Sequence, residues 1–109
     1  AMSETLPGSS PELCLVMVAP PEIEEKLLDV LLAAVGNEVF TSTPSFSHGT
    51  AQGRLSSVEQ VMGRSRSVQV QIIVTAAEMA TLLQLLRESF AGTGLRYWAM
   101  PLAALGEIV

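Results

Sequence analysis

The alternation of apolar and polar positions predicts two buried strands. Glu12–Ala19 is a short apolar run with β-branched residues that stops at Pro20-Pro21, and this pattern is typical of a strand buried on both faces. Arg66–Thr75 alternates clearly, so one of its faces carries four apolar side chains: Val68, Val70, Ile72 and Val74. Both segments are therefore expected inside a sheet.

Two further segments are predicted to be strands. Val39–His48 alternates and contains Pro44, which predicts an edge strand or a bulge. Leu95–Met100 is the fourth predicted strand, Pro101 ends it, and Leu102–Val109 can add a further short strand.

Helical periodicity occurs twice. Pro20-Pro21 opens the first helix, Gly36-Asn37 ends it, and its apolar face consists of Ile23, Leu27, Val30, Leu31 and Ala34. Thr75 caps the second helix with Glu78 three residues on, and its apolar face consists of Met79, Leu82, Leu83, Leu86 and Phe90. Gly92-Thr93-Gly94 breaks this helix.

Two segments lack such patterns. Residues 1–11 are rich in Ser, Pro and Gly, and we expect a disordered lead-in that includes a tag remnant at Ala1-Met2. Gly49–Ser65 predicts a flexible loop with one short helix near residues 57–62. The folded domain is therefore expected to span residues 12–109.

The predicted order is β-α-β-β-α-β, an α+β arrangement of the ferredoxin-like type. Two helices cover only one face of its four-stranded sheet, yet Glu12–Ala19 is apolar on both faces. The composition agrees, because 49% of the residues are hydrophobic and only 16% are charged, against about 25% charged in typical domains. We therefore expect the second sheet face to pack against other copies of the chain.

Charge and composition exclude several classes. The net charge of −5 argues against a nucleic-acid binder, and the single Cys14 argues against a disulfide framework or a multi-cysteine zinc site. No apolar run reaches the length of a membrane span, and no signal peptide is visible, so a cytoplasmic location is the default. We expect no enzyme, because Asp29 is the only Asp and no phosphate-binding loop motif occurs.

The element order and the long loop between the second and third strands resemble the PII-like superfamily, which includes nitrogen regulatory protein PII and the CutA proteins. The chain looks most like a bacterial PII-like family of unknown function that is often encoded beside heavy-metal efflux pumps. The motifs that carry this resemblance are Ser47-His48-Gly49, Leu55-Ser56-Ser57, Glu59-Gln60-Val61, Gly63-Arg64 with Arg66, Tyr97-Trp98, and Pro101 with Gly106.

The resemblance implies a trimer whose sheets face a central axis, with a partner-docking loop at residues 49–65. It also implies that Ala91–Gly94 is the turn that helps to bind phosphates in PII. The turn is shorter here and lacks the basic residue of PII, although Arg96 follows it, and this departure argues against nucleotide binding in the PII manner.

The resemblance and the residue chemistry together give three groups of candidate residues. The effector-binding candidates are His48, Gly49, Arg64, Arg66, Gly92, Thr93, Arg96 and Trp98. The candidate metal ligands are His48 and Glu59, which suit zinc, nickel, cobalt or copper once a neighbouring subunit completes the site. The partner-binding candidates on the loop are Arg54, Glu59, Gln60 and Met62.

Each candidate also has a structural interpretation. His48 can fix the loop backbone by hydrogen bonding, and the arginines can form salt bridges with Glu59 or with a neighbouring chain. Tyr97 and Trp98 point to opposite faces, where one packs under the helices and the other joins the trimer interface. Cys14 and most methionines, including Met100, are expected in the core.

The leading hypothesis is a trimeric regulatory protein that binds a metal ion, an anionic metabolite or a nucleotide at clefts between subunits. Binding would order the 49–65 loop and change its fit to a partner protein, which by analogy can be a membrane transporter. The alternatives are a CutA-like metal-binding protein linked to heavy-metal tolerance and a structural adaptor that needs no ligand. The sequence does not identify the effector or a cofactor.

Overall fold

The computed structural model describes residues 12–35, 39–49 and 64–109, and they form the predicted α+β fold. The short helix expected near residues 57–62 and the lead-in at residues 1–11 lie outside the described residues. The elements in chain order are β1 (Glu12–Ala19), a 3-10 turn η1 (Pro21–Ile23), α1 (Glu24–Val35), β2 (Phe40–His48), β3 (Arg64–Thr75), α3 (Ala76–Phe90) and β4 (Arg96–Pro101).

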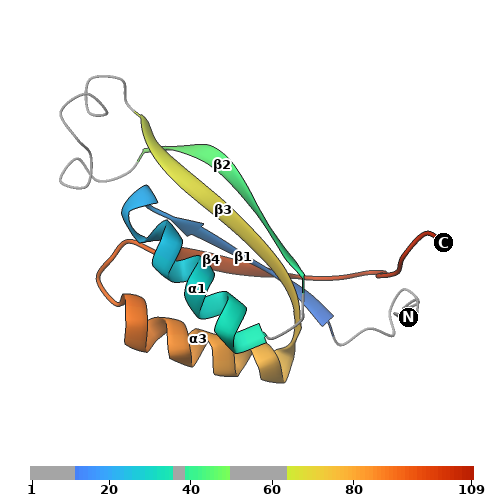
Figure 1. Cartoon of the computed structure of the whole chain (residues 1–109). Helices are drawn as coiled ribbons and strands as arrows, with labels where there is room; N and C mark the ends of the chain where they lie inside the picture. The colour runs from blue at the N-terminus through green and yellow to red at the C-terminus, as the bar shows by residue number, and fades with distance from the viewer. Residues whose placement is uncertain (1–11, 36–38, 50–63) are drawn as a thin grey trace.

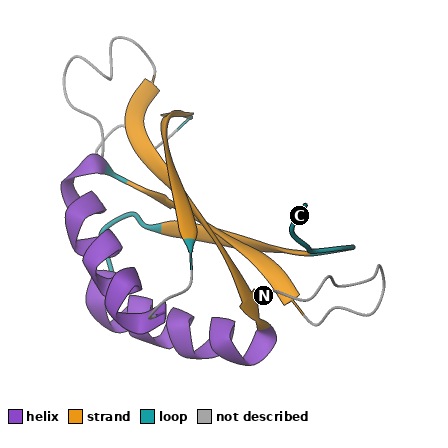
Figure 2. Ribbon diagram, turned by 45° about the vertical axis from the view of Figure 1, so that its right-hand side comes forward, coloured by secondary structure: helices purple, strands orange, loops and turns teal. Residues whose placement is uncertain are grey.

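The four strands form one antiparallel sheet in the order β2-β3-β1-β4. β1, which was predicted to be buried on both faces, and β3 are the inner strands, and β2 and β4 are the edges. Both helices lie on the same side of the strongly twisted sheet (Figures 1 and 2). The ferredoxin-like arrangement is therefore confirmed, and in the described part of the chain no helix lies over the other sheet face.

The core lies between the sheet and the two helices. Leu15 and Met17 of β1 and Val70 of β3 are fully buried on the helix side, and Leu27 and Leu31 of α1 are equally buried above them. The other buried core members are Ala19, Val68, Ile72, Val74, Leu82, Leu83, Leu86 and Phe90. The apolar stripe predicted for each helix therefore faces the sheet, although Ala34 at the end of the first stripe is exposed.

The first turn of α3 carries the predicted capping box. The Glu78 backbone N–H donates to Thr75 Oγ1 at 3.1 Å, and the Thr75 N–H donates to Glu78 Oε1 at 2.8 Å. We expect Thr75→Ala to lower the free energy of unfolding by about 1 kcal/mol, because the Glu78 backbone N–H loses the hydroxyl to which it donates, whereas the backbone N–H of residue 75 still has Glu78 Oε1 as its acceptor. Urea unfolding at a fixed protein concentration measures the effect.

Thr81→Ala is the matched control for this prediction. Thr81 is exposed on the same helix, and its hydroxyl donates to a carbonyl that the helix already uses, that of Ala77, at 3.3 Å. The control should change stability by less than about 0.5 kcal/mol. Equal losses in the two variants would show that the capping box is not the cause.

The structure corrects four expectations. Arg64 and Ser65 belong to β3 rather than to the loop, because they continue the pairing with His48 and Ser47. Residues 102–109 form no further strand: only a single-residue bridge at Leu105 follows β4.

The other two corrections concern burial. Of Tyr97 and Trp98, one of which was expected to pack under the helices, Tyr97 lies on the helix side, but it is 48% exposed, because β4 is an edge strand and α3 ends at Phe90. Met100, expected in the core, is 46% exposed on the other face, where no helix covers it.

The uncovered face carries an apolar patch, which we call the open-face patch. Sheet pairing places Trp98 opposite Val16 and Met100 opposite Cys14, with Ile73 beyond them. Cys14 is buried as predicted, and its thiol lies 3.7 Å from Gln71 Oε1. Trp98 is 42% exposed in the single chain, so an aromatic side chain sits at the centre of an uncovered surface.

Among the described residues, no helix has the length and apolar character that crossing a membrane requires.

Candidate functional site

The candidate site lies where the inner strand β1 ends and its neighbour β3 continues. Ala19, the last residue of β1, pairs with Val68, whereas β3 begins four residues earlier at Arg64. Pro20-Pro21 ends β1 because a proline nitrogen has no hydrogen to donate to the sheet. The β2–β3 hairpin therefore extends past β1 and leaves a notch in the sheet.

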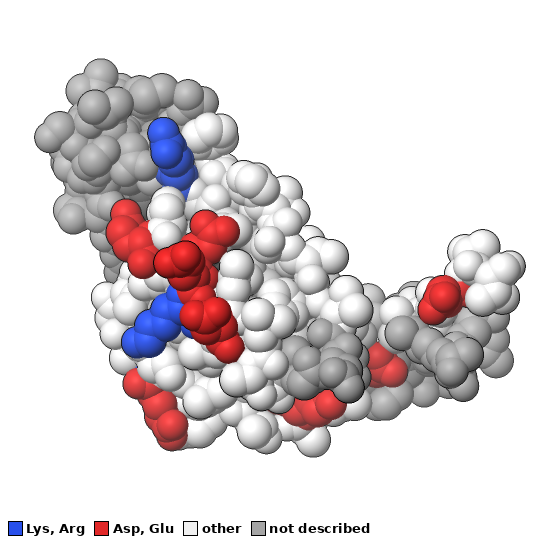
Figure 3. Space-filling model, in the orientation of Figure 1, with Lys and Arg blue, Asp and Glu red and all other residues white. Residues whose placement is uncertain are grey.

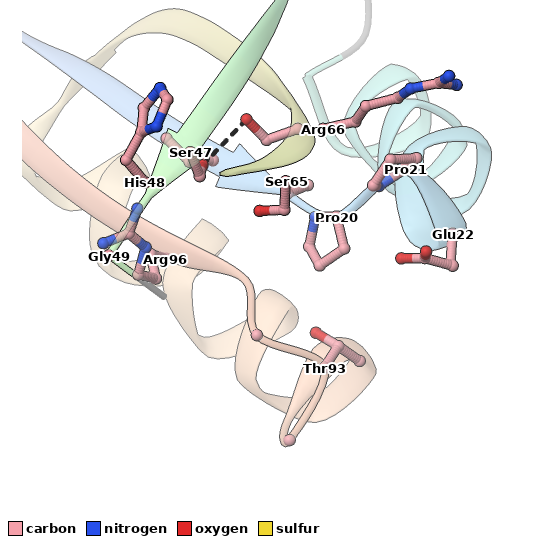
Figure 4. A pocket seen from close by; sticks show the side chains of 15 residues that line it. Pro20, Pro21, Glu22, Ser47, His48, Gly49, Ser65, Arg66, Thr93 and Arg96 are labelled. Atoms are coloured by element: carbon pink, nitrogen blue, oxygen red, sulfur yellow. Dashed lines mark hydrogen bonds between the residues drawn. The ribbon is translucent and has the colours of Figure 1, made fainter. Parts of the chain in front are cut away.

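A cavity of about 360 Å³ occupies this notch. Three segments supply its walls: the end of β1 with η1, the base of the β2–β3 hairpin, and the turn between α3 and β4 (Figure 4). The lining residues are Val18, Ala19, Pro20, Pro21, Glu22, Ser47, His48, Gly49, Ser65, Arg66, Ser67, Gly92, Thr93, Gly94 and Arg96. Residues far apart in the sequence thus share one polar hollow.

The turn after α3 has a backbone shape that needs glycine. Gly92 and Gly94 have φ angles of 77° and 92°, a region that other residues rarely adopt. Thr93 holds the turn: its hydroxyl donates to the Phe90 carbonyl at 2.7 Å and accepts from the Leu95 N–H at 3.4 Å. The predicted effector residue Thr93 therefore stabilises the shape of the cavity wall.

Serine hydroxyls line the hairpin side of the cavity. Ser47 Oγ donates to Ser67 Oγ at 3.1 Å, drawn as the dashed line in Figure 4, and the Ser45 and Ser67 hydroxyls lie 2.8 Å apart. Ser67 is the buried polar residue at the centre of this network. Hydroxyl groups both donate and accept, so this wall can bind either the oxygens or the N–H groups of a ligand.

The charged side chains that line the cavity point in different directions. Arg96 lies beside His48 and Gly49, whereas the Arg66 side chain extends toward Pro21, away from Arg96 (Figure 4). Glu22 is exposed at the η1 side, where acidic side chains gather over η1 and the start of α1 (Figure 3). Arg96 and the glycine turn thus line the same cavity, whereas Glu22 lies at its η1 side.

Six of the eight predicted effector residues line this one cavity: His48, Gly49, Arg66, Gly92, Thr93 and Arg96. The Arg64 side chain and the loop candidates Arg54, Glu59, Gln60 and Met62 lie outside what the structure describes. The structure does not bring Trp98 to the cavity of its own chain, because it lies on the open face opposite Val16.

Sequence reasoning did not list several lining residues, above all the serines. Strand pairing matches Ser45 with Ser67 and Ser47 with Ser65. The signal was present in the sequence, because the hairpin carries a mirrored Ser-x-Ser on either side of its loop. Glu22 of η1 also lines the cavity, and its place there depends on the turn at Pro20-Pro21.

Comparison with known proteins identifies a family that the sequence matches. Residues 9–109 match the family described as protein of unknown function DUF3240. The fold is similar to the crystal structure of a DUF3240 family protein from Shewanella baltica OS155, with a TM-score of 0.74, 23% sequence identity, and coverage of 92% of this chain and 99% of that one. No curated protein matches the sequence.

Two further solved structures with a similar fold are a CutA protein and a PII-like protein. CutA from Synechococcus elongatus PCC7942 has a TM-score of 0.66 and 18% identity, covering 94% of this chain and 85% of that one. CPII, a nitrogen regulatory PII-like protein from Thiomonas intermedia K12, has a TM-score of 0.67 and 14% identity, covering 90% and 96%. The chain therefore belongs to the DUF3240 family, and its fold is that of the PII-like superfamily.

Proposed function

We propose that the protein is a trimeric PII-like regulator that binds a small anionic effector in the notch cavity. The observation that carries this proposal is the meeting of Arg96, the Gly92–Gly94 turn and the serine wall around one cavity of about 360 Å³. Such a cavity is large enough for a small metabolite. The 49–65 loop would then dock a partner protein, such as a transporter, according to the state of the cavity.

The chemistry of the walls favours an anion. A guanidinium group binds carboxylate or phosphate with paired hydrogen bonds, and backbone turns with glycines at positive φ present N–H groups to anions. Arg96 and the Gly92–Gly94 turn both line the cavity, and because the Thr93 N–H of this turn already donates to the Phe90 carbonyl at 3.2 Å, Arg96 is the main candidate to bind the anion. The CPII structure contains bound ADP, AMP and bicarbonate, which supports this class of effector in a related fold.

A metal ion is the second candidate. His48 and Glu22 line the cavity, and the structure of a periplasmic divalent cation tolerance protein CutA from Archaeoglobus fulgidus has a similar fold, with a TM-score of 0.61. Zinc sites in proteins use three or four protein ligands, however, and the described residues contain no group of three or more His, Cys, Asp or Glu suited to a metal. The ligand set therefore favours the anion.

The test is binding of defined ligands to the purified protein. Bicarbonate, phosphate, AMP, ADP and ATP are titrated by calorimetry, with zinc chloride in a separate arm. We expect at least one anion to bind, and we expect Arg96→Ala to weaken it roughly tenfold or more, because a hydrogen bond to a charged group contributes about 1.5–3 kcal/mol.

Lys26→Ala is the matched control, because it also removes one positive charge and Lys26 is exposed on α1 and does not line this cavity. The control should bind the anion with unchanged affinity. Absence of binding by any anion, or equal weakening in both variants, would contradict the anion proposal. Binding of zinc alone, lost in His48→Ala, would support the metal candidate in its place.

A further inference from the structure

A second hollow shares the glycine turn with the notch cavity. Gly92 and Gly94 line both, so the turn is a wall of each. The second hollow has a volume of about 190 Å³, and its other walls come from α3 and β4, so we call it the α3–β4 groove. Its lining residues are Leu83, Leu86, Arg87, Phe90, Ala91, Gly92, Gly94, Leu95 and Tyr97.

The most buried residues of the α3–β4 groove belong to the hydrophobic core. Leu83, Leu86 and Phe90 are core members, and all three also line the groove. β4 is the last strand of the described sheet and α3 ends at Phe90, so no further strand of that sheet closes the groove on this side. Apolar surface gains free energy when it leaves water. An apolar group is therefore the favoured occupant of the inner part of the groove.

The charge of the groove is positive. Among the described residues that line it, Arg87 is the only charged one, and it is exposed in the last turn of α3. Within the described part of the chain, its side chain has no hydrogen-bond or ion-pair partner. A guanidinium group binds a carboxylate through two parallel hydrogen bonds. The groove therefore suits a ligand that joins an apolar body to one carboxylate.

The size of the groove limits the apolar body. An apolar cavity of about 150 Å³ with Leu, Ile and Phe walls holds one benzene molecule. At about 190 Å³, the α3–β4 groove has room for one ring with a short substituent. Phe90 and Tyr97 supply aromatic walls, and aromatic rings pair favourably with one another in offset or edge-to-face geometry. Size and wall chemistry thus favour a single aromatic ring.

We propose that the α3–β4 groove binds a small aromatic carboxylic acid, with the ring beside Phe90 and Tyr97 and the carboxylate on Arg87. The inference goes beyond the proposed function, because the site, the arginine and the ligand all differ from those of the notch cavity. Tyr97 places the groove on the helix side of the sheet. Covering the open-face patch with other copies therefore does not cover the groove.

Nuclear magnetic resonance of the full chain with labelled leucine methyl groups tests the site, with phenylacetate as the probe. We expect the ring current of the bound acid to shift the resonances of Leu83, Leu86 and Leu95, and we expect those of Leu32, which is exposed on α1, to stay in place. Phenylacetamide keeps the ring but has no charge, so it should bind at least roughly tenfold more weakly. Acetate has no ring and should cause no shift.

Two arginine variants locate the carboxylate. Arg87→Ala should weaken phenylacetate binding roughly tenfold or more, because it removes hydrogen bonds to a charged group. Arg96→Ala is the matched control, since Arg96 lines the notch cavity and not the groove, and it should bind phenylacetate like the wild type. Circular dichroism verifies that both variants are folded. The comparison of phenylacetate with phenylacetamide uses the wild type and gives the same information if Arg87→Ala does not fold.

Three results would overturn the proposal. Loss of phenylacetate binding in Arg96→Ala but not in Arg87→Ala would place the acid in the notch cavity. Tighter binding of hexanoate than of phenylacetate would show that the groove selects an alkyl chain and not a ring. Absence of leucine shifts with both acids would show that the groove binds neither, and it would leave the proposed function standing, because that function depends on anion binding at Arg96.

Discussion

Replacing Trp98 with glutamate should convert the proposed trimer into single chains of 11.6 kDa. Trp98 is at the centre of the open-face patch, opposite Val16 and beside Met100, and the helices leave this face uncovered. A carboxylate at that position would lose its water on assembly without gaining a partner, so the trimer would be destabilised in all three copies. Light scattering after gel filtration at micromolar concentration measures the mass.

The expected destabilisation of the assembly is large because two free-energy costs add: lost burial of apolar surface and burial of an unpaired charge. Covering the 42% of Trp98 that is exposed removes on the order of 80 Å² of mostly apolar surface, and this is worth about 2 kcal/mol per chain. Burial of an unpaired charge adds a cost of several kcal/mol per chain. Because this cost applies to each of the three chains, the total loss exceeds the free energy of assembly of a trimer that forms at micromolar concentration.

Leu32→Glu is the matched control for Trp98→Glu. Leu32 is 57% exposed, more than Trp98, but it lies on α1 in the helix layer and not on the open face. The control should keep the mass of the wild type. If Trp98→Glu keeps the trimer mass as well, then the open face is not the surface through which the copies assemble.

Much of the fold can be predicted from the spacing of apolar and polar residues along the sequence, because this spacing indicates which side chains are buried. The alternation in β3 and the apolar run of β1 identified the inner strands, and the spacing of Thr75 and Glu78 identified the start of α3. Pro44 correctly indicated an edge, because an outer strand tolerates a residue that has no N–H to donate. These features depend on neighbours within a few residues, and a single sequence contains them.

The burial of Tyr97 depended instead on tertiary geometry. Alternation correctly placed Tyr97 and Trp98 on opposite faces, but how far α3 covers β4 depends on where the helix ends and how strongly the sheet twists. The extent of strand pairing is equally non-local: Ser65 joins β3 because Ser47 is available across the hairpin. Neither property can be derived from periodicity within one segment.

The notch cavity was predictable in part. The resemblance to PII-like proteins brought together His48, Arg66 and Arg96 from three places in the chain, and the structure gathers them around one cavity. The sequence alone did not show why a cavity exists there, since it arises from the difference in length between β1 and β3. The direction of Arg66 toward Pro21 is a further outcome that only side-chain packing decides.

Replacing Leu15 with alanine should lower the free energy of unfolding by about 2–5 kcal/mol, the range for removing a buried leucine side chain. Leu15 has no exposed surface, and it lies in the middle of β1 between Ile72 of β3 and Ala99 of β4. Its side chain faces the helices, so the loss would leave a hole in the core and not at the open face. Urea unfolding at fixed protein concentration measures the change.

Leu32→Ala removes the same atoms from a site that is 57% exposed and should cost less than about 1 kcal/mol. The comparison separates core packing from the intrinsic effect of the substitution. Since Leu15 faces away from the open-face patch, the folded variant should also retain the mass of the wild type. Equal losses of stability in the two variants would contradict the placement of the core, whereas a monomeric Leu15→Ala would show that the helix-side core and the interface between copies are coupled through β1.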